Sequence, residues 1–178
     1  MRCLGTLPSL PIPLLFLAVF SGCCLCKPNS SLYDDVAEAT IRKQISVLQE
    51  PLIESTKLAN IRKEGHIYIS FGQGPNSDPS ASFMARFSGE PTPDIRSKSQ
   101  YRSDGIVVNP KTGWPGSILQ IDRVTCISKT KAEVQYTMID WQNYSMGFLS
   151  KLSKAQTGWL VTNTTVLWNT HPEDKRLE

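Results

Sequence analysis

Residues 131–139 read Lys-Ala-Glu-Val-Gln-Tyr-Thr-Met-Ile, and their alternation decides the fold class. The apolar side chains share one parity and the polar side chains share the other: Ala132, Val134, Tyr136 and Met138 against Glu133, Gln135 and Thr137. Successive side chains of a β-strand point to opposite faces, so a period of two predicts a strand with one buried and one solvated face. Such a strand is typical of an antiparallel sheet that is covered on one side.

Further strands are expected on both sides of this stretch. Residues 118–127 form an apolar run whose parity switches near Asp122-Arg123, which predicts a β-bulge there. Residues 146–152 and 159–168 follow as two more strands, with Gly158 at the turn between them. Far upstream, residues 66–71 alternate in the same way. The chain is therefore expected to form a sheet of about five strands, and its last four strands are expected to be antiparallel.

Helical spacing appears only before and just after the first strand. Apolar residues recur from Tyr33 to Leu48 with the period of a helix, which Ser31 is expected to cap. Residues 52–61 predict a second, weaker helix. Asp78 is expected to cap a short third helix. Residues 89–117 are polar and rich in proline and glycine, which predicts a long irregular binding loop or lid with a brief edge strand at 106–108.

This order of elements predicts an α+β fold in which N-terminal helices pack on a curved, mainly antiparallel sheet. Over residues 31–168 it resembles the nuclear-transport-factor-2-like (cystatin-like) domains. The ending Gly158-Trp159-Leu160-Val161 followed by Trp168 is similar to the closing hairpin of such domains and of uncharacterised secreted bacterial proteins. The resemblance implies a layout, but that fold hosts enzymes and binding modules alike, so it implies little about function.

The first residues are typical of a secretory signal peptide. Arg2 precedes an apolar stretch from Leu10 to Phe20, and the signal is expected to end at residue 22, or at residue 26. Residues 23–31 would then be a tether, residues 32–170 a single α+β domain, and residues 171–178 a charged tail. The protein is therefore expected to be exported, either to the cell envelope or into the medium.

The stretch Phe20-Ser21-Gly22-Cys23 resembles the bacterial lipobox, which implies that Cys23 carries the lipid that holds the protein on a membrane. An ordinary signal peptide cleaved after Cys24 or Cys26 is the alternative. An uncleaved anchor spanning residues 7–26 is a third possibility, which three prolines in its first half disfavour.

Composition excludes several functions. The net charge of +3 is weak and unclustered, so no nucleic-acid partner is expected. The chain has only two histidines, neither at ligand spacing from a cysteine, so neither a metal nor another cofactor is expected. Cys126 lies beyond the leader in an apolar strand and is expected to be a buried, unreactive thiol without an intrachain disulfide. Asn29, Asn143 and Asn163 each begin an Asn-x-Ser/Thr motif, which has meaning only in a host that glycosylates.

One group of residues could carry acid–base chemistry. Asp140 continues the parity of Tyr136, so its carboxyl group could face an apolar interior, where burial would raise its pKa. Tyr136 or His66 could be its partner. The competing interpretation is that Asp140 ends the strand beside solvent, because Asp-Trp-Gln-Asn is also a good turn sequence.

Two functions are favoured at this point, and a structural role in an envelope assembly is a third that stays open. The first is a non-catalytic, exported module that binds an unknown small molecule or protein through the open face of the sheet and the 89–117 loop. The second is a small acid–base enzyme or ligand carrier that uses Asp140, Tyr136 and His66.

Overall fold

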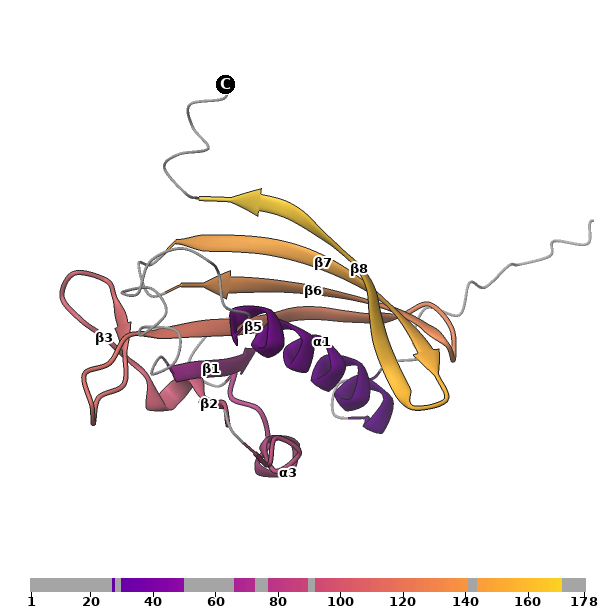
Figure 1. Ribbon diagram of the computed structural model, residues 1–178, viewed down its shortest axis with the longest axis horizontal. Helices are drawn as coiled ribbons and strands as arrows, with labels where there is room; N and C mark the ends of the chain where they lie inside the picture. Colours follow the sequence, from indigo (N-terminus) through magenta and orange to yellow (C-terminus); the bar gives the residue numbers. More distant parts are fainter. Residues whose placement is uncertain are drawn as a thin grey trace, which may run out of the picture.

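The long C-terminal strands form the main sheet, as their alternation predicted. The computed structural model describes residues 27, 30–49, 66–72, 77–89, 92–140 and 144–170. Four antiparallel strands follow one another in the chain and in the sheet: β5 (Gly116–Cys126), β6 (Lys131–Ile139), β7 (Ser145–Ala155) and β8 (Gly158–Asn169). The long strands curve, and helix α1 lies across them (Figure 1). The fold class is α+β, as expected.

Two shorter strands extend this sheet beyond β5. Strand β1 (His66–Phe71) pairs parallel with β5, and β2 (Asp94–Ile95) pairs parallel with β1. The resulting order is β2-β1-β5-β6-β7-β8, so the sheet has six strands instead of about five. The additional strand is β2, whose two residues lie in the stretch expected to be irregular. The predicted bulge is confirmed, because the β5–β6 register shifts between Ile121 and Arg123.

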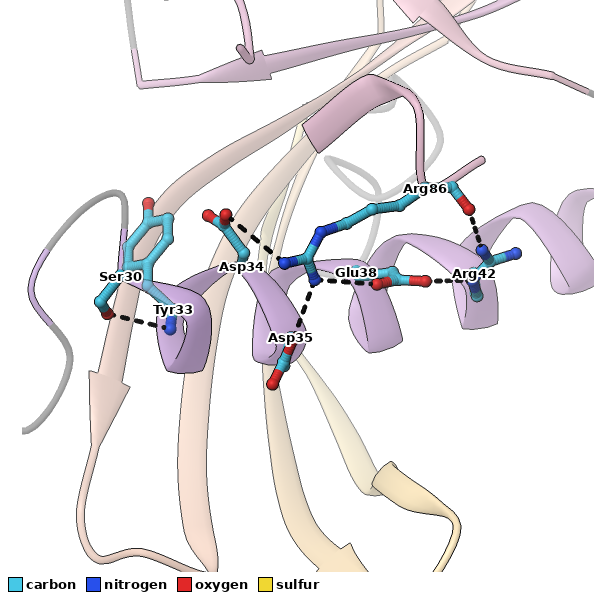
Figure 2. Close-up of polar contacts among 7 residues, drawn as sticks. All are labelled: Ser30, Tyr33, Asp34, Asp35, Glu38, Arg42 and Arg86. Atoms are coloured by element: carbon cyan, nitrogen blue, oxygen red, sulfur yellow. Dashed lines mark hydrogen bonds and ion pairs between the residues drawn. The ribbon is translucent and has the colours of Figure 1, made fainter. Parts of the chain in front are cut away.

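Helix α1 (Ser31–Gln49) covers one face of the sheet, which is called the helix face below. Val36, Ala37 and Ile41 are fully buried and belong to the same core as Val134 of β6. The helix cap is Ser30 and not Ser31, because the Tyr33 amide donates to Ser30 Oγ at 3.3 Å (Figure 2). The predicted second helix at 52–61 lies outside the described residues, as do the leader at 1–26 and the tail at 171–178.

The short helix α3 (Ala81–Met84) begins two residues later than expected. Its cap is Ser80, whose Oγ accepts a hydrogen bond from the Phe83 amide at 3.2 Å. Asp78, the predicted cap, instead accepts a hydrogen bond from the Ser97 amide at 3.0 Å. The sequence prediction was wrong here because the carboxylate binds a segment that is distant in the chain.

A cluster of ion pairs fastens the residues after α3 to α1 (Figure 2). The Arg86 guanidinium lies 2.8 Å from Asp35, 3.2 Å from Glu38 and 3.7 Å from Asp34, which are all on α1. Arg42 pairs with Glu38 at 2.8 Å and also donates to the Arg86 carbonyl oxygen. Arg86 therefore bridges segments that lie about fifty positions apart in the sequence.

The described residues 92–115 are more ordered than the sequence predicted. Besides β2, they form the 3-10 helix η1 (Arg96–Lys98) and a two-stranded sheet of β3 (Gln100–Tyr101) and β4 (Val107–Val108). Val107 is fully buried against Tyr68 and Ile118, on the face opposite α1, which is called the outer face below. This packing gives the sheet a second, smaller core. The expectation of one long irregular loop is therefore corrected.

Candidate ligand-binding cavity

A cavity of about 530 Å³ lies on the outer face of the sheet, where β1 and β2 meet the segment that runs through η1 to residue 111. Its volume is within the range of small-molecule sites. The residues that line it include Tyr68, Asp94, Ser97, Lys98, Asn109 and Lys111. The loop that the sequence singled out as a possible binding loop thus supplies most of the wall.

The parallel pairing of β1 and β2 places two of these groups side by side. Tyr68 and Asp94 are register partners, so their side chains lie on the same face of the sheet. The Asp94 carboxylate accepts from the Ile95 amide at 2.8 Å, and its Oδ1 lies 2.8 Å from the Lys98 ammonium. One turn of η1 therefore brings a cation and an anion together at the cavity wall.

Tyr68 is the most unusual group of this site. Its side chain is only 1% exposed, yet its hydroxyl group has no hydrogen-bond partner. Burial raises the pKa of the Tyr68 phenol, and the neighbouring Asp94 carboxylate raises it further. The phenol is therefore protonated at neutral pH. An unpaired buried hydroxyl costs about 1–3 kcal/mol, which a ligand could recover by completing the hydrogen bond.

The position of the Tyr68 ring depends on Gly116. A Cβ atom at residue 116 would lie 2.7 Å from Tyr68 Cε2 and 2.9 Å from the His66 carbonyl oxygen. Both distances are shorter than a real contact allows. The glycine at the start of β5 thus leaves room for the Tyr68 ring and for the His66 carbonyl group.

The arrangement suits a small polar molecule that carries negative charge. Two ammonium groups, from Lys98 and Lys111, face one carboxylate, from Asp94. Hydroxyl and amide groups of Ser97 and Asn109 add donors and acceptors. No cluster of three or more metal-ligating side chains occurs among the residues that the structure describes.

The predicted acid–base residues do not meet on one face of the sheet. Tyr136 is 1% exposed in the core under α1, stacked on Phe148 with 5.1 Å between ring centroids. Its hydroxyl lies 3.5 Å from Ser150 Oγ. His66 shares the parity of Tyr68, and their ring centroids lie 6.2 Å apart, so His66 belongs to the outer face. A sheet therefore separates Tyr136 from His66.

Asp140 lies at the end of β6 and helps to form the connection to β7. Its carboxylate accepts from the Tyr144 amide at 3.0 Å, and its own amide donates to the Tyr144 carbonyl oxygen at 2.9 Å. These two bonds are those of a turn residue, in agreement with the competing interpretation of the sequence.

Cys126 is not a thiol, because it is disulfide-bonded. The expectation that Cys126 is an unpaired thiol is therefore wrong.

Comparison with known protein families, with curated proteins and with solved structures finds no match to this chain. Within the described part of the chain, no helix has the length and apolar character needed to cross a membrane.

The sequence missed the residues that form the cavity. It placed Tyr68 in a strand and flagged the 89–117 segment as a binding loop, but nothing local shows that the two meet. The one available signal was the unusual composition of that loop. The burial of Tyr68 follows from the packing of β4 on the outer face, which periodicity does not reveal.

Proposed function

We propose that this protein is a non-catalytic module that binds a small, polar, negatively charged ligand in the cavity beside Tyr68. The observation that carries the proposal is Tyr68, which lines the cavity and whose buried hydroxyl group has no hydrogen-bond partner. Lys98 and Lys111 supply the attraction for negative charge, and the phenol supplies a donor that a carboxylate or phosphate oxygen can accept.

The test uses the Tyr68→Phe variant, for which the proposal predicts opposite effects on stability and on binding. Without ligand, removing an unpaired hydroxyl should leave the free energy of unfolding unchanged or raise it. With ligand, the same change should weaken binding about tenfold, since a hydrogen bond to a charged group is lost. Amide chemical shifts of residues 94–111 would be followed while inorganic phosphate, acetate or citrate is added, with glucose as the uncharged control.

Lys111→Gln is a second variant, which removes one positive charge from the rim and leaves the Asp94–Lys98 pair in place. It should weaken binding of the anions and leave glucose unaffected. Anions that cause no shift in residues 94–111, or that bind Tyr68→Phe as tightly as the parent protein, would show that this cavity is not the ligand site.

We also propose that the protein is exported and, where Cys23 is acylated, held on a membrane by that lipid. The disulfide of Cys126 supports export, because structural disulfides persist mainly in oxidising compartments.

Intact mass and non-reducing peptide mapping of the protein from its native host test both statements. A diacylated Cys23 together with a disulfide-linked Cys126 peptide would support export to the envelope in the lipid-anchored form. A lipid-free chain that begins at Leu25 or Lys27 would support plain secretion instead.

The finer layout is also proposed to be that of the nuclear-transport-factor-2-like (cystatin-like) domains. It is supported by α1, which packs against one face of a curved sheet, and by the four antiparallel strands β5 to β8 (Figure 1). An experimental structure that includes residues 50–65 tests this layout, because that family places further helices on the same face as the first.

A further inference from the structure

Strand β8 forms one edge of the main sheet and lacks the charged side chains that usually protect an edge strand. It is twelve residues long, and no charged residue occurs between Gly158 and Asn169. The opposite edge is β2, which has two residues and is followed by Arg96 and Lys98. Natural sheets usually blunt their edges with short strands or charged side chains, so β2 is protected and β8 is open for pairing.

We propose that β8 pairs antiparallel with β8 of a second copy of this chain, which joins the two sheets in a symmetric dimer. The sequence of the strand reads almost the same in both directions: Trp-Leu-Val-Thr-Asn from residue 159 and Trp-Leu-Val-Thr-Thr backwards from residue 168. A two-fold symmetric interface places one surface against itself, so a self-complementary strand suits it. Because β8 carries no charged side chain, no like charges of the two strands meet when two copies pair.

Two irregularities of β8 set which residues this pairing would bring together, and the first lies at Thr162. Asn163 and Val161 pair with adjacent residues of β7, Lys151 and Leu152, so Thr162 is an extra residue in β8. Because of this extra residue, Val161 and Val166 lie on the same face although they are five positions apart. A two-fold axis through Thr164 then sets Val161 of one copy opposite Val166 of the other, on the helix face.

Exposed apolar side chains lie where the second copy would cover them. Among the described residues, four of the large hydrophobic side chains with high exposure belong to β8, with exposed fractions between 45% and 57%: Leu160, Val166, Leu167 and Trp168. Leu167 is a second extra residue of β8, because Val166 and Trp168 pair with the adjacent β7 residues Phe148 and Gly147. The same register therefore brings Leu160 opposite Trp168. Apolar and β-branched cross-strand pairs of this kind stabilise antiparallel ladders.

The test measures the mass of the exported protein in solution over a wide range of concentrations, with two matched variants. Thr165→Lys adds a charge to an exposed position at the centre of β8. Gln135→Lys adds the same charge to an exposed position of β6, an inner strand of the sheet. We expect Thr165→Lys to raise the dissociation constant of the dimer about tenfold or more, and Gln135→Lys to change it by less than about twofold.

Circular dichroism confirms that both variants fold, and hydrogen exchange of the β8 amides should slow as the dimer forms. A parent protein that stays monomeric at every concentration would overturn the proposal. A dimer that tolerates Thr165→Lys would also overturn it, because the interface would then lie elsewhere. So would a glycan on Asn163 in the native protein, because the sugar would occupy the edge.

Discussion

The substitution of Arg86 by Met tests whether the ion-pair cluster in Figure 2 stabilises the fold. Methionine keeps most of the aliphatic length and removes the charge. The Arg86 side chain is 29% exposed and contacts three carboxylates, of which Asp34 and Glu38 are about four-fifths buried. A single exposed pair contributes about 0.2–1 kcal/mol, and three contacts of one guanidinium are not additive, so we expect a loss of about 1–2 kcal/mol.

Urea unfolding at neutral pH measures this loss, and Arg102→Met is the matched control. Arg102 pairs with Asp104, which is only two residues away, and both side chains are exposed. That pair holds no distant segments together, so its removal should leave the urea midpoint nearly unchanged. If Arg86→Met and Arg102→Met had the same urea midpoint as the parent protein, the Arg86 cluster would not stabilise the fold.

The loss should also depend on pH. Burial raises the pKa of Asp34, Arg86 opposes this rise, and Asp35 adds to it. Removing Arg86 should therefore raise the pKa of Asp34 further. At acidic pH the carboxylates are protonated in both proteins and Arg86 has nothing to pair with, so the stability difference should shrink as the pH falls below the carboxyl pKa values. A difference that stayed constant down to acidic pH would contradict the electrostatic explanation.

Three further predictions concern the sheet and its disulfide. Gly116→Ala should lower the free energy of unfolding by about 1–3 kcal/mol, measured by thermal unfolding, because the new Cβ meets the His66 carbonyl oxygen. Gly147→Ala should lower it less, because only the half-exposed Trp168 indole has to move. Burial raises the pKa of Tyr136 above its ordinary value of 10.0, so the stability that it contributes below pH 10 should be lost as the pH rises through its folded pKa. Tyr136→Phe should therefore flatten the alkaline decline in the free energy of unfolding. A decline that is the same in both proteins would contradict this. Reduction of the Cys126 disulfide should destabilise the protein by about 2–5 kcal/mol, and equal unfolding midpoints with and without reductant would show that it does not stabilise the fold.

The alternation of residues 131–139 and the helical spacing after Ser31 were sufficient to predict β6 and α1. Both patterns are local, because the period of a strand or a helix is set by neighbouring residues of the same element. The bulge near Asp122 was predictable for the same reason, since one extra residue inverts the parity of the strand. The caps were less predictable, because Asp78 binds residue 97 instead of its own helix.

What only the tertiary structure decided is which surfaces meet. The sequence showed β8 as a strand but not as the edge of the sheet, and it showed Tyr68 in a strand but not beneath β4. The cavity and the separation of Tyr136 from His66 both depend on segments that are far apart in the chain. Periodicity reports how one element is built, whereas burial and pairing depend on long-range contacts that leave no regular pattern in the sequence.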